Sequence, residues 1–79
     1  MATLRFFAGA AEAAGADTAF FDVSTIGELR NELARRYGLD FVRVLGLCSL
    51  LVNGERATDD ALTLTATDAV DVLPPFAGG

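Results

Sequence analysis

The chain has 79 residues, a hydrophobic content of 52% and a formal net charge of -5 at pH 7. This length allows one domain with a small core, and the hydrophobic content argues against intrinsic disorder. All six basic residues are arginine, and an acidic chain without clustered cations is a poor ligand for nucleic acid.

Two strands are predicted in the first part of the chain. Alternating apolar side chains over 3–8 predict the first strand, and residues 18–23 predict a second strand that forms a hairpin with it. The segment 9–17 between them is rich in alanine and glycine. We interpret it as a connection with room for one helical turn.

The strongest pattern predicts a helix that begins after Thr25. Thr25 and Glu28 form a capping box, in which each side chain accepts from the other residue's backbone N–H. Glu32 and Arg36 are spaced to pair on the exposed side, and Gly38 is a suitable residue to follow the helix end. The apolar stripe of this helix consists of Ile26, Leu29, Leu33 and Tyr37.

A second hairpin is predicted in the middle of the chain. Asn53-Gly54 is the strongest two-residue signal for a type I′ turn. It would join a strand over 49–52 to a short return strand over 55–57. The apolar segment 41–45 before them fits either a short helical turn or a loop.

The last strand is predicted over 69–73, and Pro74-Pro75 ends it because proline cannot donate to a strand ladder. The order is then two strands, a helix and three further strands. This order indicates an α+β fold of the β-grasp, or ubiquitin-like, kind. A mixed sheet packs against one main helix, with the first and last strands central and parallel.

The single cysteine, Cys48, excludes an internal disulfide and is compatible with a reducing cytoplasm. Because Cys48 lies among leucines, we interpret it as a small core residue. Asp59, Asp60 and Asp68 are interpreted as turn formers and solvated charges, so no metal site is expected. No apolar run reaches the length of a membrane span.

The chain resembles the small, sulfur-carrier subunit of molybdopterin synthase, a member of the ubiquitin-like sulfur carriers. The resemblance covers nearly the whole length, from residues 4–8 through 25–30 and 52–55 to 73–79. The last segment is the most specific. A Pro-Pro pair shortly before a closing Gly-Gly is typical of this group.

The resemblance implies a reactive carboxylate at Gly79, with Gly78 as its slender neighbour. An adenylating enzyme related to E1 enzymes would activate Gly79 with ATP, and sulfur would then replace AMP to give a thiocarboxylate. The large subunit of molybdopterin synthase would receive this tail. The chain itself would bind no cofactor and would not be catalytic alone, because the catalytic groups would belong to its partners.

Residues 1–75 are expected to form the domain and 76–79 a flexible tail. Pro74 and Pro75 would stiffen the exit from the sheet, because proline fixes φ. Phe76 and Ala77 are predicted to contact the partner.

Phe7 and Leu73 are predicted to lie on the sheet face opposite the helix, as an apolar patch for the same partner. The alternative is a strand register shifted by one residue, which would place both side chains in the core.

Three other functions remain open on the sequence alone. A carrier of the same build could serve cysteine or thiamine synthesis. A protein modifier would join its terminal glycine to lysines of target proteins. A plain β-grasp binding module would be indifferent to the loss of Gly79.

Overall fold

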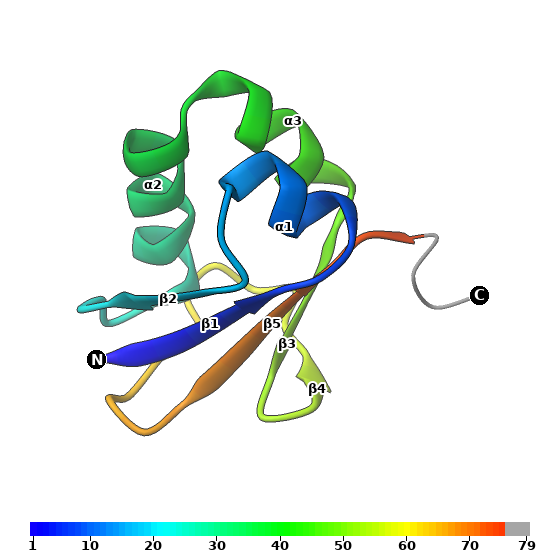
Figure 1. Cartoon of the computed structure of the whole chain (residues 1–79). Helices are drawn as coiled ribbons and strands as arrows, with labels where there is room; N and C mark the ends of the chain where they lie inside the picture. Colours follow the sequence, from blue (N-terminus) through cyan, green and yellow to red (C-terminus); the bar gives the residue numbers. More distant parts are fainter. Residues whose placement is uncertain (76–79) are drawn as a thin grey trace.

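A computed structural model describes residues 1–75, and residues 76–79 lie outside the described part. No helix in the described part is long and apolar enough to cross a membrane. The elements (Figure 1) are β1 (Ala2–Phe6), α1 (Gly9–Ala14), β2 (Thr18–Phe21), α2 (Ile26–Tyr37), α3 (Leu39–Leu47), β3 (Ser49–Val52), β4 (Glu55–Arg56) and β5 (Ala69–Leu73).

The five strands form one mixed sheet in the order β2-β1-β5-β3-β4. β1 and β5 lie next to each other and are parallel, with Leu4 opposite Val70 and Phe6 opposite Val72. The other neighbouring strands are antiparallel. The predicted β-grasp fold, with its first and last strands central and parallel, is therefore confirmed.

The core lies between one face of the sheet and the helices (Figure 1). Leu4, Val70 and Val72 are fully buried on the inner face of the sheet. The rings of Tyr37 and Phe41 each meet the ring of Phe6 edge-on, with centroids 5.7 Å apart in both pairs. Edge-on contacts of this kind add to the stabilisation that burial provides.

Helix α2 spans the predicted residues, but two of its side-chain pairs differ from the expectation. Thr25 Oγ1 accepts from the Glu28 backbone N–H at 3.2 Å, while the Glu28 side chain accepts from the N–H of Ser24 and not of Thr25. Glu32 pairs with Arg35 at 3.0 Å. The predicted pair of Glu32 with Arg36 is wrong, because the Arg36 guanidinium lies 4.1 Å from the ring centroid of Phe21.

The connection between β1 and β2 is more ordered than expected. β1 ends at Phe6 because Ala8 adopts φ 50° and ψ -125°, which turns the chain out of the strand. The six residues of α1 follow, with Ala10 fully buried. The predicted strand over 3–8 was thus too long at its end.

The structure also settles the assignment of one segment and the ends of two strands. The apolar segment 41–45 belongs to α3, a helix of nine residues in which Phe41 and Leu45 are buried one turn apart. β2 ends at Phe21, two residues earlier than predicted. β4 ends at Arg56, although the backbone N–H of Ala57 still donates to Leu50 O at 2.8 Å.

The turn between β3 and β4 has the predicted type I′ backbone, with positive φ at Asn53 (51°) and Gly54 (88°). The Asn53 side chain donates to Asp68 Oδ1 at 2.9 Å and accepts from the Ala69 backbone N–H at 3.0 Å. Asp68 also accepts from the backbone N–H of Thr65 at 2.8 Å. These bonds fasten the turn to the start of β5.

The segment after β4 crosses the N-terminal end of α2. The carbonyl oxygens of Leu62 and Asp60 accept from the backbone N–H groups of Ile26 and Gly27, at 3.1 and 2.9 Å. A Cβ atom at Gly27 would lie 3.3 Å from Asp60 O, so this close approach favours glycine. The donors of this helix end are therefore satisfied within the chain.

Candidate functional site

The candidate site begins where β5 ends. β5 is central and parallel to β1, so both strands end at the same side of the sheet (Figure 1). The backbone N–H of Phe7 donates to Val72 O at 3.2 Å, and Leu73 pairs with Ser49 of β3. The chain thus leaves the sheet between the end of β1 and the start of β3.

The two prolines that follow differ in exposure. Pro74 is buried and Pro75 is exposed. Because proline has no N–H, neither residue can extend the ladder of β5. In this structure Pro74 packs against the domain and fixes the direction in which the chain leaves, whereas the surface of Pro75 is open. Their predicted partner contacts stay predictions.

Phe7, directly after β1, and Leu73, the last residue of β5, lie on the outer side of the sheet, opposite the core. The Phe7 side chain is 36% exposed, and Leu73 is half-buried. Their strand neighbours Phe6 and Val72 are buried in the core, so the predicted facing of the strands is confirmed. A strand register shifted by one residue, which would place Phe7 and Leu73 in the core, is therefore excluded. Whether Phe7 and Leu73 bind a partner stays a prediction.

A fork-shaped ion pair, which was not predicted from the sequence, lies beside this apolar patch. Arg5 Nε and Nη2 donate to the two carboxylate oxygens of Asp71, at 2.7 and 2.9 Å. The hydrogen bond and the charge of Asp71 raise the pKa of Arg5. The guanidinium carbon also lies 5.8 Å from the ring centroid of Phe7. The pair can be predicted only when the register of β1 against β5 is known.

The other predicted tail residues are Phe76, Ala77, Gly78 and Gly79, and all four lie outside the described residues. The proposed boundary between a domain (1–75) and a tail (76–79) therefore stays a prediction. The structure shows where the chain leaves the sheet and which residues surround this point.

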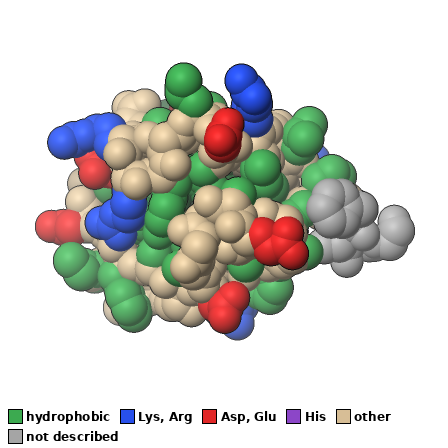
Figure 2. All heavy atoms as spheres, turned by 45° about the horizontal axis from the view of Figure 1, so that its top comes forward, with side chains coloured by type: hydrophobic (Ala, Val, Ile, Leu, Met, Phe, Trp, Pro, Cys, Tyr) green, Lys and Arg blue, Asp and Glu red, His purple; other side chains and the backbone are tan. Residues whose placement is uncertain are grey.

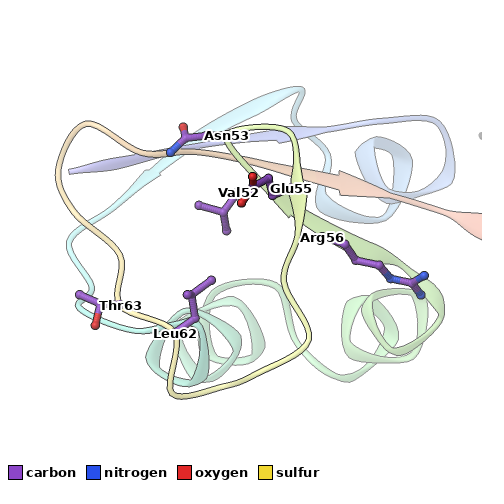
Figure 3. Close-up of a pocket in the computed structure, with 6 residues that line it drawn as sticks. All are labelled: Val52, Asn53, Glu55, Arg56, Leu62 and Thr63. Carbon is purple, nitrogen blue, oxygen red and sulfur yellow. The ribbon is translucent and has the colours of Figure 1, made fainter.

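Among the cavities formed by residues 1–75, two have a volume of about 430 Å³ each and open on the surface. One lies between the β3–β4 hairpin and the following loop, where Val52 and Leu62 point into it from opposite sides and Arg56 points away (Figure 3). It lies near the start of β5, far along the strand from the tail exit. The other opens at the end of β1, next to Phe7.

The remaining polar candidates have structural roles. Asp59 Oδ1 accepts from the Ala61 backbone N–H at 2.9 Å, and Asp60 pairs with Arg30 at 3.0 Å. No group of three or more metal-ligating side chains occurs within residues 1–75. On the helical side, basic and acidic side chains are interspersed (Figure 2).

Cys48 is half-buried, and its Sγ donates to Val44 O at 3.1 Å. Burial raises the pKa of this thiol, so the thiolate is disfavoured. This agrees with the interpretation of Cys48 as a small core residue.

The sheet order, the crossing helix and the exit of the chain from a central strand define a ubiquitin-like β-grasp protein. A model of the ThiS family matches residues 4–79. The chain therefore belongs to the ThiS family, a family of ubiquitin-like sulfur carriers.

Solved structures agree with this assignment. SAMP1 from Haloferax volcanii is 29% identical with a TM-score of 0.80, and the match covers 99% of this chain and 98% of that one. The complex of subunits 1 and 2 of the molybdopterin-converting factor from Helicobacter pylori contains a chain that is 27% identical, with a TM-score of 0.77 and coverages of 99% and 97%.

Small archaeal modifier protein 1 from Methanosarcina acetivorans has a TM-score of 0.83 at 21% identity, with coverages of 99% and 95%, and supports the fold alone. No curated protein matches the chain by sequence.

Proposed function

We propose that this protein is the sulfur carrier of molybdopterin synthase, the small subunit that delivers sulfur during molybdenum cofactor biosynthesis. The proposal is supported by the way in which the chain leaves the end of β5. The chain leaves a central strand beside exposed Phe7, with Pro74 packed into the domain. A partner that covers this face would also receive the segment that follows.

The chemistry takes place at the carboxylate of Gly79. A carboxylate oxygen attacks the α-phosphate of ATP in an adenylating enzyme, which releases pyrophosphate and supplies AMP as a leaving group. Hydrosulfide then attacks the acyl carbon and AMP leaves, so that the carboxyl group becomes a thiocarboxylate. Donation of this sulfur to a cyclic pterin precursor, with water supplying oxygen, restores the carboxylate.

The partner would be the large subunit. Four residues follow Pro75, and an extended chain spans at most about 3.6 Å per residue, so the reacting atom lies within about 14 Å of Pro75. The large subunit would therefore hold its active site close to the surface that covers Phe7 and Leu73. The similar chain from Helicobacter pylori occurs in a complex of the two subunits of its converting factor. We also propose that an adenylating enzyme is the second partner and that the protein acts in the cytoplasm.

Protein modification is the second candidate function. It is favoured by the 29% identity to SAMP1, because the same protein from the same organism is also described as small archaeal modifier protein 1. A modifier would transfer its activated Gly79 to an amine of a target protein. Both functions need the same activated Gly79. They differ in the acceptor, which is a pterin precursor for the sulfur carrier and an amine of a target protein for the modifier.

The test is sulfur transfer with purified components. The thiocarboxylated protein, incubated with the large subunit and the cyclic pterin precursor, is expected to yield molybdopterin. Deletion of Gly79 should abolish the product and leave thermal unfolding unchanged, while the control Glu55→Gln, at an exposed position of the β3–β4 hairpin, should remain active.

Product formed without Gly79 would contradict the carrier function. Failure to form product, together with ATP-dependent conjugates to lysines of added proteins, would favour the modifier instead.

A further inference from the structure

The cavity at the end of β1 has apolar walls and a charged rim. Phe7, Ala8 and Ala11 form the walls, from the end of β1 and from α1. Arg5 and Asp17 also line the cavity, and because both are exposed we call them its rim. Asp17 O accepts from the backbone N–H of Phe6 at 2.9 Å, so the start of β2 is fixed against the end of β1. The cavity is thus built by three elements with defined contacts.

This cavity adjoins the surface from which the chain leaves the sheet. Phe7 is both a wall of the cavity and part of the outer sheet face, and its backbone N–H is bound to Val72 O. Because β1 and β5 end together, the cavity and Pro74 lie at the same end of the sheet. A partner that covers Phe7 would therefore lie next to the cavity.

The rim indicates what kind of side chain fits. Asp71 occupies Nε and Nη2 of Arg5, and no described residue accepts a hydrogen bond from Nη1. The exposed carboxylate of Asp17 forms no ion pair among the described residues. A hydrogen-bond donor, Nη1 of Arg5, and an acceptor, the Asp17 carboxylate, therefore border the apolar part of the cavity.

An aromatic side chain suits these surroundings, because its ring can pack against the Phe7 ring. Tyrosine fits best, since its hydroxyl both accepts and donates hydrogen bonds. Large aromatic side chains seated in pockets often dominate the affinity of a protein interface.

We propose that the cavity at the end of β1 is an anchor pocket that receives an aromatic side chain, preferably tyrosine, from the partner that takes the tail. The inference rests on the proposed function, because it assigns this partner as the large subunit of molybdopterin synthase. The anchor would set the position of the carrier before the tail reaches the active site.

Two matched variants test the anchor pocket. Thr18 lines this cavity and Thr63 lines the cavity of Figure 3, and both threonines are exposed. Thr18→Phe should fill the anchor pocket, and phenylalanine is well tolerated in a strand. Thr63→Phe makes the same change at the other cavity. Circular dichroism and thermal unfolding check that both variants fold.

Affinity for the host's large subunit is the readout, measured by isothermal titration calorimetry. Thr18→Phe is expected to weaken binding at least tenfold, and Thr63→Phe less than twofold. In the complex with the unaltered protein, the NMR amide signals of Ala8 and Thr18 should shift more than that of Thr63.

Equal affinities of the two variants and the unaltered protein would overturn the anchor pocket and leave the proposed function standing. If the unaltered protein self-associates and Thr18→Phe abolishes this without changing the affinity for the large subunit, the cavity belongs to the contact with a second copy, and the anchor pocket is overturned. If the unaltered protein does not bind the large subunit, the proposed function fails and the inference fails with it.

Discussion

Asp68, directly before β5, uses both of its carboxylate oxygens: Oδ1 accepts from the Asn53 side chain of the β3–β4 turn, and Oδ2 accepts from the backbone N–H of Thr65. The hydrogen bonds from the Thr65 backbone and from the Asn53 side chain lower the pKa of Asp68. A carboxyl group whose pKa is lower in the folded state stabilises the fold when it is ionised. Its contribution is present above the unfolded pKa, near 3.9, and is lost as the pH falls through the folded pKa.

We therefore expect Asp68→Asn to lower the urea midpoint of unfolding at pH 7. Because the unaltered protein loses the ionised carboxylate at low pH, the difference between the two proteins should shrink below about pH 4. Urea titrations at pH 7, 4 and 2.5 measure this. A difference that stays constant over the whole range would show that the charge of Asp68 does not contribute.

Individual residues were predicted well where the chemistry is local. Asn53-Gly54 specifies its turn through backbone conformation alone. The Arg5–Asp71 pair could not be predicted, because it joins residues 66 positions apart and depends on strand register. Arg36 was assigned to the wrong partner for the same reason, since Phe21 comes from another element.

At the scale of elements, the junction between β1 and α1 is the main difference from the sequence prediction. Ala8 has a positive φ of 50° with ψ -125°, a conformation that costs an L-residue free energy. No glycine marks this position, so the pattern suggested that the strand continues. The short helix α1 was underestimated because a run of alanines carries no apolar periodicity.

The backbone at Ala8 gives a test of this junction. Ala8→Gly should stabilise the protein by about 1 kcal/mol, because glycine adopts positive φ without the steric cost. The control Ala13→Gly, at an exposed position of α1, should destabilise it by about 0.5–1 kcal/mol. Chemical denaturation measures both. A destabilisation by Ala8→Gly as large as that of the control would contradict this description of the junction.

At the scale of the whole molecule, the fold followed from the order of the elements and from one amphipathic helix. The outer-face position of Phe7 and Leu73 followed from strand alternation. The burial of Pro74 did not, because it depends on how the end of β5 packs against its surroundings. The anchor pocket also needed the assembled sheet, since β1, α1 and β2 each contribute to it.

The molecule as a whole is organised around the central strand β5, from whose end the chain leaves the sheet. The helices and the inner sheet face form the core, while the outer face and the tail exit remain accessible at one end of the sheet. In the proposed function this end presents Gly79 to two enzymes in turn, first for adenylation and then for sulfur donation.

The most direct test is top-down mass spectrometry of the protein purified from its native host. A fraction is expected to carry sulfur in place of one carboxylate oxygen, with fragmentation placing it at Gly79. Localisation matters because oxidation of Met1 or Cys48 adds nearly the same mass. A terminus that stays unmodified after incubation with ATP, sulfide and host extract would contradict the carrier function.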